Sequence, residues 1–314
     1  MDQLFDIAHT TNENALALQA HHAAWHTFWV MGSLAEARQH IASGLSFYRR
    51  EAHGEQAFQY GGHDPSVCGR ASEALIATAM GYPAHGAKQM EEALRAAHEL
   101  DHMPTRIQAL WCAAELYQIL REPRKVEEFT NVVLPLLADH GSAVGLSNAT
   151  MLRGWAQVLR GQAEEGISRM REGLAAWRAT GSKFQATYRL ARAADAHLFA
   201  GETDVGLQLI DEAIHQSGDN WLLPDVHRVR GELLLLSGQN NDVEECFGRA
   251  LKAAQAQRAR LLELRAAMSM ARLWRSQGKP QQARELLAPV YGWFTEGFDT
   301  LDLKEAKALL EELA

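Results

Sequence analysis

Small and large apolar residues recur at fixed distances from seven regularly spaced positions along the chain. These positions are Gly32, Gly81, Arg121, Gly161, Gly201, Gly238 and Gly278, and the intervals between them run from 37 to 49 residues. Gly or Ala fills 16 of the 21 places that lie seven residues before, five after and twelve after them. Small residues let two antiparallel helices approach closely, and a left-handed glycine ends a helix. The pattern therefore predicts a helical hairpin around each position.

Larger apolar residues occupy a second regular place, nine residues after most of the seven positions. They are Ile41, Met90, Met170, Ile210, Phe247 and Leu287. Side chains of this size would fill the space between successive hairpins. No sustained alternation of β-branched residues and no Asn-Gly turn indicates a strand. The chain is therefore predicted to be all-α.

This register resembles the tetratricopeptide repeat, a family of stacked helical hairpins with a period of about 34 residues. The resemblance implies one domain over residues 1–314, folded as a right-handed superhelix of about seven hairpins. A capping helix is expected over 302–313, with Asp302 as its N-cap and Glu305 completing a capping box. The expected hairpins cover about 15–50, 66–100, 104–140, 143–180, 183–217, 221–257 and 260–296.

Several segments support a narrower resemblance. They are Tyr60–Cys68, Met80–Pro83, Leu152–Trp155, Gly173–Trp177, Ala271–Gly278 and Leu287–Asp299. They resemble the C-terminal helical repeats of large bacterial regulators, which also carry a class III adenylate/guanylate cyclase or other output domain and an AAA-type ATPase. That likeness implies a regulatory role, with the repeats sensing a ligand or partner. The chain lacks a Gly-x-x-x-x-Gly-Lys-Ser/Thr phosphate loop, so neither nucleotide hydrolysis nor cyclase activity is carried over.

The charge and cysteine content restrict the environment and the partners. The formal net charge is −8 and the isoelectric point about 6.0, which argues against a nucleic-acid partner. Cys68, Cys112 and Cys246 show no paired spacing, as expected of free thiols in a reducing cytosol. The sequence begins without a signal-peptide pattern and contains no apolar run of 18 residues. We therefore expect a cytoplasmic protein with no membrane partner.

Histidines and one cysteine offer the only candidates for chemistry. His22 and His26 lie one helical turn apart, a spacing that suits zinc, but the glutamate of a His-Glu-x-x-His motif is absent. His63 near Cys68 could form a thiol–imidazole pair. We favour histidines that pack or line a groove, and a buried cysteine. The expectation is therefore no enzyme, no catalytic residue, no metal and no cofactor.

The resemblance to tetratricopeptide stacks implies a concave groove lined by the first helix of each hairpin. Counting back from the seven positions predicts an aromatic middle and a basic C-terminal end. The expected groove residues are His22, His26, Trp29, Trp111, Glu115, Met151, Trp155, Tyr188, Asp195, Arg228, Glu232, Arg265 and Arg272. Tyr60, His63 and Asp64 are further candidates in the loop before the second hairpin. Packing of the tryptophans between repeats remains the alternative to a binding role.

Three functions follow from these patterns, in order of preference. The first is a regulatory or scaffold module that binds a protein or peptide, including its own ATPase and cyclase domains in a longer chain. The second is a sensor of a sugar- or nucleotide-like small molecule, because a bacterial maltose-regulon activator has a related superhelix. The third is a metal-dependent hydrolase. The sequence makes no prediction of the oligomeric state.

Overall fold

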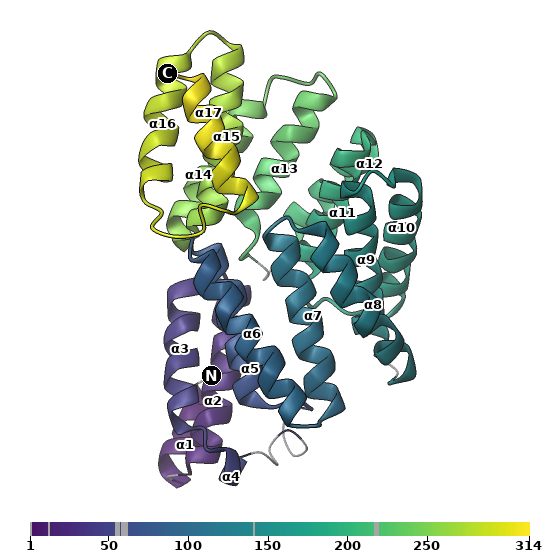
Figure 1. Cartoon of the computed structure of the whole chain (residues 1–314), viewed down its shortest axis with the longest axis vertical. Helices are drawn as coiled ribbons and strands as arrows, with labels where there is room; N and C mark the ends of the chain where they lie inside the picture. Colours follow the sequence, from purple (N-terminus) through teal and green to yellow (C-terminus); the bar gives the residue numbers. More distant parts are fainter. Residues whose placement is uncertain (1, 12, 54–56, 58–61, 141, 217–219) are drawn as a thin grey trace.

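The structure is a computed structural model that describes residues 2–11, 13–53, 57, 62–140, 142–216 and 220–314. No β-strand occurs within these ranges, and the elements are α-helices that pair into antiparallel hairpins (Figure 1). The predicted all-α fold is confirmed. None of the described helices is long and apolar enough to cross a membrane.

Seven helical hairpins follow one another along the chain. They are α2 (Asn14–Val30) with α3 (Leu34–Phe47), α5 (Pro65–Ala79) with α6 (Pro83–Glu99), α7 (Met103–Ile119) with α8 (Pro123–Asp139), α9 (Ala143–Leu159) with α10 (Ala163–Ala179), α11 (Ala186–Ala200) with α12 (Thr203–His215), α13 (Leu223–Leu236) with α14 (Val243–Gln257), and α15 (Arg260–Ser276) with α16 (Pro280–Gly292). The remaining helices are α1 (Asp2–Thr11), α4 (Arg50–His53) and α17 (Leu301–Glu312). The sequence pattern did not predict α1, which packs on α2.

The seven predicted positions end the first helices in the left-handed conformation. All six glycines have a positive φ, between 76° and 97°. Arg121 takes the same conformation with a φ of 60°, although its side chain makes that backbone unfavourable. An arginine at a place that favours glycine indicates that its side chain makes contacts that offset the cost of this backbone conformation.

The small residues mark places where two helices touch backbone to backbone. A Cβ added at Gly154 on α9 would lie 2.7 Å from the carbonyl oxygen of Gly166 on α10. A Cβ at Gly173 would lie 2.6 Å from Met151 Cγ and 2.9 Å from the Ser147 carbonyl oxygen. No larger residue fits without moving one helix, which explains the small residues at these places.

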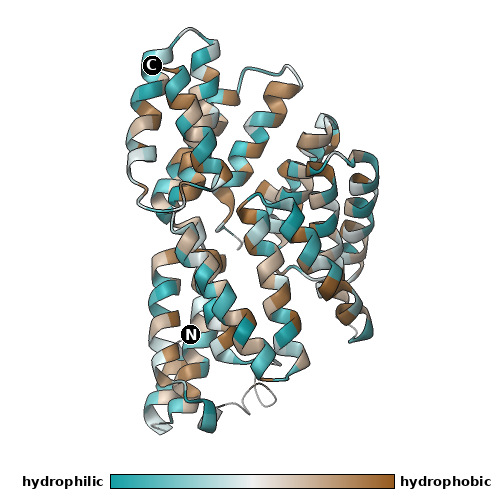
Figure 2. Ribbon diagram, viewed as in Figure 1, coloured by the Kyte–Doolittle hydropathy of each residue, from teal (hydrophilic) through white to brown (hydrophobic). Residues whose placement is uncertain are grey.

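The large apolar residues predicted between hairpins are all buried, as Ile41, Met90, Phe247 and Leu287 illustrate. Hydrophobic and hydrophilic residues alternate along the helices in Figure 2, as in amphipathic helices that pack on both neighbours. One extended core runs from the first hairpin to the start of the seventh, and smaller clusters continue it to α17.

The superhelix bends back on itself, so that its first hairpin meets the sixth and its second hairpin meets the seventh. The Asn220 amide donates to the Val30 carbonyl oxygen at 2.7 Å, although the two residues belong to different ends of the stack. The Trp221 ring lies 5.7 Å from that of Trp29 and 5.8 Å from that of Tyr188, measured between centroids. In Figure 1, α14 and α15 meet the ends of α5 and α6. The pattern of neighbouring repeats did not predict this closure.

The N-terminus of the capping helix differs from the sequence prediction. Thr300, not Asp302, is the N-cap residue of α17, and no side chain caps the helix. Asp302 is instead buried and paired with Arg265 and Arg121. The capping-box prediction was wrong because these arginines bind the carboxylate that would have capped the helix.

Candidate functional site

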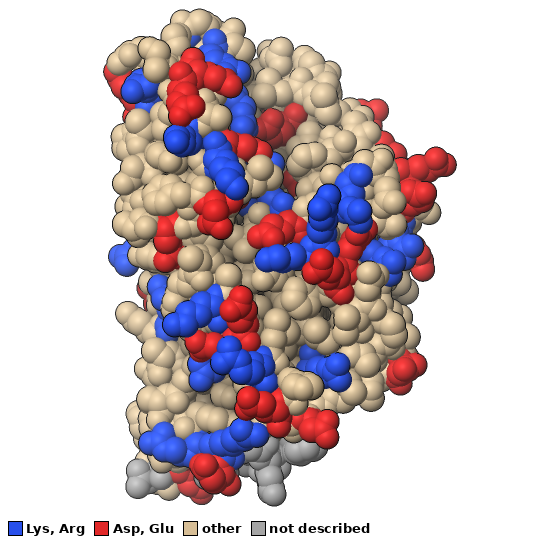
Figure 3. Space-filling model, in the orientation of Figure 1, with Lys and Arg blue, Asp and Glu red and all other residues tan. Residues whose placement is uncertain are grey.

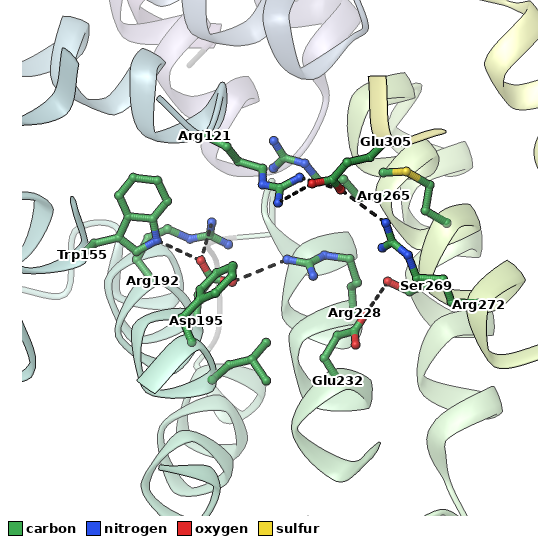
Figure 4. A pocket seen from close by; sticks show the side chains of 13 residues that line it. Arg121, Trp155, Arg192, Asp195, Arg228, Glu232, Arg265, Ser269, Arg272 and Glu305 are labelled. Atoms are coloured by element: carbon green, nitrogen blue, oxygen red, sulfur yellow. Dashed lines mark hydrogen bonds and ion pairs between the residues drawn. The ribbon is translucent and has the colours of Figure 1, made fainter. Parts of the chain in front are cut away.

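The inner face of the superhelix contains a cavity of about 270 Å³ that we call the arginine cavity (Figure 4). The first helices α9, α11, α13 and α15 contribute most of its wall, together with the end of α7 and the start of α17. Its lining comprises Arg121, Trp155, Arg192, Asp195, Leu198, Phe199, Arg228, Glu232, Arg265, Met268, Ser269, Arg272 and Glu305. First helices, which were predicted to line a groove, therefore form most of the wall of this cavity.

Two arginines on one side of the cavity are held by carboxylates. Arg228 Nε donates to Asp225 Oδ1 at 2.6 Å, and Arg192 also pairs with Asp225. Trp155 Nε1 donates to Asp195 Oδ2 at 2.9 Å, which fixes this second carboxylate between the two guanidinium groups. Burial alone would raise the pKa of Asp225, but the charges of Arg228 and Arg192 outweigh burial and hold that pKa below its ordinary value.

Three more arginines surround the start of α17. Arg265 donates to both carboxylate oxygens of Asp302, at 3.0 and 2.7 Å. Arg121 donates to Asp302 at 3.2 Å and to both oxygens of Glu305 at 3.0 Å, and Arg272 donates to Glu305 at 3.3 Å. The side chain of Arg121 therefore joins the third hairpin to the capping helix, which accounts for an arginine at a glycine position.

The charges of the arginine cavity form two layers. Five arginines and three carboxylates line it, and two aspartates behind this lining balance the remaining two positive charges. Asp225 and Asp302 lie behind this lining and are buried. They hold the guanidinium groups in place, so little side-chain entropy remains to be lost when an anion enters. On the face drawn in Figure 3, acidic and basic side chains are interspersed.

The lowered pKa of Asp225 predicts how acid affects stability. Its ionised form is favoured in the folded protein, so its contribution is complete above the ordinary aspartate pKa of about 4 and is lost as the pH falls through the lower folded value. We expect the free energy of unfolding to fall between about pH 5 and 3, and to fall less steeply in Asp225→Asn. Urea unfolding at several pH values measures both slopes. Asp211→Asn, which removes an exposed carboxylate on α12, is the control. If the dependence of unfolding free energy on pH became equally shallow in Asp211→Asn, Asp225 would not be the source of the acid sensitivity.

A second cavity, of about 360 Å³, lies between the first, second, third and fifth hairpins, and we call it the aromatic cavity. Its lining comprises His26, Trp29, His63, Ser72, Pro104, Ile107, Gln108, Trp111, Cys112, Glu115, Leu137, His140, Ser142, Phe184 and Gln185. Trp111 Nε1 donates to Glu115 Oε1 at 2.7 Å, and Asn148 Nδ2 donates to the same oxygen at 3.0 Å. Burial raises the pKa of Glu115. The cavity thus combines an apolar wall with a few fixed polar groups.

A histidine–cysteine cluster adjoins the aromatic cavity. His22 and His26 lie on α2, His63 precedes α5, and Cys68 lies on α5. Burial lowers the pKa of His22 to about 2 and that of His63 to about 4, with nearby histidines contributing, so both rings are neutral at pH 7. Burial raises the pKa of the Cys68 thiol to about 12, which does not favour a nucleophilic thiolate.

The predicted groove residues divide into two cavities and a buried set. Trp155, Asp195, Arg228, Glu232, Arg265 and Arg272 line the arginine cavity, and His26, Trp29, His63, Trp111 and Glu115 line the aromatic cavity. Met151, Tyr188 and His22 are buried and line neither. Asp64 caps α5, where its Oδ1 accepts from the amides of Ser66 and Val67 at 2.8 and 3.1 Å. Tyr60 lies outside the described residues.

Sequence reasoning missed three of the charged residues that line the arginine cavity: Arg121, Arg192 and Glu305. Arg121 carried a usable signal, because it replaces glycine at one of seven equivalent positions. Arg192 and Glu305 carried none, because their place in the cavity depends on the curvature of the stack and on closure by α17.

Sequence comparisons find one curated relative and no family. No protein-family model matches the chain. The uncharacterized protein R02095 of Rhizobium meliloti (strain 1021) is 24% identical over 266 residues, which are 83% of this chain and 26% of that protein. The chain thus spans about a quarter of the length of the curated relative that it matches.

Solved structures of similar shape are helical-repeat proteins. The apo form of RapI matches with a TM-score of 0.53 and 12% identity, over 91% of this chain and 98% of RapI. The Rap conjugation gene regulator of plasmid pLS20, in complex with the Phr* peptide, matches with a TM-score of 0.53 and 11% identity, over 94% of this chain and 95% of that chain. These similarities show a tetratricopeptide-like solenoid. They give no specific support to the cyclase and ATPase resemblance.

Proposed function

We propose that the chain is a non-enzymatic regulatory module that binds a peptide or protein segment inside the superhelix. An acidic group of that segment, its terminal carboxylate or an Asp or Glu side chain, would lie in the arginine cavity. The observation that carries the proposal is the set of five arginines that line one cavity and are held in place by carboxylates beside and behind them. Guanidinium groups held by carboxylates behind them are suited to bidentate recognition of a further carboxylate.

The relation of the two cavities favours an extended ligand. Helix α7 contributes Trp111 to the aromatic cavity, and Arg121, just beyond its end, lines the arginine cavity. These residues are ten positions apart, about 15 Å along a helix. An extended peptide of about five residues covers such a distance, and aromatic and arginine side chains are frequent anchors in interfaces. The pLS20 regulator of similar fold, in complex with its Phr* peptide, adds a precedent.

Peptides selected from a random library, displayed with a free carboxyl terminus, provide the probe. We expect Arg272→Ala to weaken binding of a selected peptide about tenfold, measured by fluorescence anisotropy. Arg272 is partly exposed, and its one ion pair among the described residues is with Glu305 at 3.3 Å, so its loss should cost the fold little. The same peptide with an amidated terminus and neutral side chains should bind wild type about as weakly as the unmodified peptide binds the variant.

Arg275→Ala is the matched control. Arg275 lies one turn further along α15, has a similar exposed fraction, and pairs with Glu312 away from the arginine cavity. Its removal should leave peptide affinity unchanged. Equal weakening in both variants, or no effect of Arg272→Ala, would contradict an anionic anchor in this cavity.

A small-molecule sensor is the second candidate, and the aromatic cavity is the observation that favours it. Its volume and mostly apolar wall with a few polar groups are typical of ligand pockets. A thermal-shift screen with sugars and nucleotides tests this function, because a ligand raises the melting temperature by mass action. A hit that Trp111→Ala abolishes, together with no selected peptide, would favour the sensor over the peptide module.

The regulatory context is also a proposal. The curated relative is much longer than this chain, so a comparable arrangement would place further domains beside the superhelix. Binding inside the superhelix could then be transmitted through α17, which the ligand-facing residues Arg121 and Arg272 both contact.

A further inference from the structure

Donor atoms of the histidine–cysteine cluster converge at one buried point beside the aromatic cavity. The Nε2 atoms of His22 and His63 lie 3.2 Å apart. Together with Cys68 Sγ, these ligand atoms all lie within 4.8 Å of one another. His26 Nε2 lies 3.7 Å from Cys68 Sγ on the side of the aromatic cavity. Three imidazoles and one thiol therefore meet where no carboxylate or ammonium group makes a hydrogen bond with their converging atoms in the described structure.

The outer nitrogens of two rings fix the direction of their lone pairs. His22 Nδ1 lies 3.2 Å from Gln19 Oε1, and His26 Nδ1 lies 3.2 Å from the His22 carbonyl oxygen. Both oxygens accept, so both Nδ1 atoms donate, and the lone pair of each neutral ring is on Nε2. Metal-binding histidines commonly have this arrangement, with the second nitrogen bonded to a carbonyl or carboxyl oxygen.

The spacing of the donor atoms suits a tetrahedral ion. Zn–N and Zn–S bonds of about 2.0 and 2.3 Å place neighbouring ligand atoms roughly 3.3 to 3.6 Å apart. The His22–His63 contact of 3.2 Å lies just below that range, and the His26–Cys68 contact of 3.7 Å lies just above it. Imidazole and thiolate donors favour zinc over magnesium or calcium, which take oxygen ligands.

We propose that this cluster binds one Zn²⁺ through His22 Nε2, His63 Nε2 and Cys68 Sγ, with a water molecule or another small ligand in the fourth position. Binding releases the thiol proton to solvent and forms a Zn–thiolate bond. The ion would tie α2 to α5 and to the segment that leads into it, and so fix one wall of the aromatic cavity. The site is separate from the arginine cavity, and it does not depend on the proposed peptide binding.

The first experiment measures metal in protein purified without a histidine tag, incubated with Zn²⁺ and dialysed. We expect one zinc ion per chain in wild type and near-background content in His63→Ala and Cys68→Ser. Cys112→Ser is the control, because Cys112 lines the aromatic cavity but is not one of the converging donors, and it should retain full zinc. No retained zinc in wild type, or equal loss in Cys112→Ser, would overturn the proposal.

Two further measurements distinguish a lost ligand from a damaged fold. Replacement of zinc by Co²⁺ should give a thiolate-to-cobalt charge-transfer band in wild type, and its absence would contradict ligation by Cys68. Gln19→Ala removes the hydrogen bond behind His22, and we expect about tenfold weaker zinc binding with the band intact. Unchanged zinc affinity in this variant would contradict the assigned role of His22. Arg272→Ala should keep full zinc, which separates this proposal from peptide binding.

Discussion

Asp302→Asn is expected to lower the free energy of unfolding by about 3–5 kcal/mol, because it leaves buried arginine charge without its partner. Asp302 is buried and accepts two hydrogen bonds from Arg265 and one from Arg121. Arg265 also donates to the Ile119 carbonyl oxygen, so this group joins α15 and α17 to the end of α7. Asparagine keeps the shape of the side chain and removes its charge. Urea unfolding followed by circular dichroism measures the change.

Glu311→Gln is the control for this effect. Glu311 lies on the same helix, is exposed and pairs with Lys307 at 3.9 Å, so its neutralisation should cost less than about 0.5 kcal/mol. Adding Arg265→Met to Asp302→Asn should recover part of the loss, since the uncompensated charge is then removed. If Asp302→Asn is as stable as wild type, α17 is not held by this carboxylate.

Trp155→Ala is expected to lower the free energy of unfolding by about 3–5 kcal/mol, the usual cost of removing a buried tryptophan. Trp155 is only 1% exposed, although it reaches the wall of the arginine cavity. Its loss would also leave Asp195 without the hydrogen bond from Nε1. The sequence analysis placed Trp155 among the expected groove residues. Burial makes Arg272→Ala the better test of binding, and thermal or urea unfolding measures the cost at Trp155.

Phe199→Ala provides the comparison for Trp155. Phe199 lines the same cavity but is 51% exposed, so its removal should change the free energy of unfolding by less than about 1 kcal/mol. If Trp155→Ala and Phe199→Ala lowered the free energy of unfolding by similar amounts, the burial of Trp155 would not explain its effect on stability.

The hairpin architecture was predictable because its causes are local. Each glycine position forces a left-handed turn, and each small residue marks a contact between neighbouring helices. Such contacts repeat at a nearly constant interval, so they can be recognised in one sequence as small residues at regular positions. Most of the wall of the arginine cavity followed as well, because first helices contribute it.

Closure and the exact lining depend on residues far apart in sequence. Arg121 and Asp302 are separated by 181 positions, and no repeat pattern relates them. Tyr188 was expected in the groove, but it is buried against Trp221 of the next hairpin. Trp155, another predicted groove residue on a first helix, reaches a cavity. Small differences in curvature decide between these outcomes, and they accumulate along the stack.

Hydrogen exchange of the protein with and without a library-selected peptide tests the central claim most directly. Binding inside the superhelix predicts slower amide exchange in the inner helices α11, α13 and α15 and at the end of α7, with little change in the outer helices α12, α14 and α16. Slower exchange confined to the outer helices would place the peptide on the convex surface and contradict the proposed binding site.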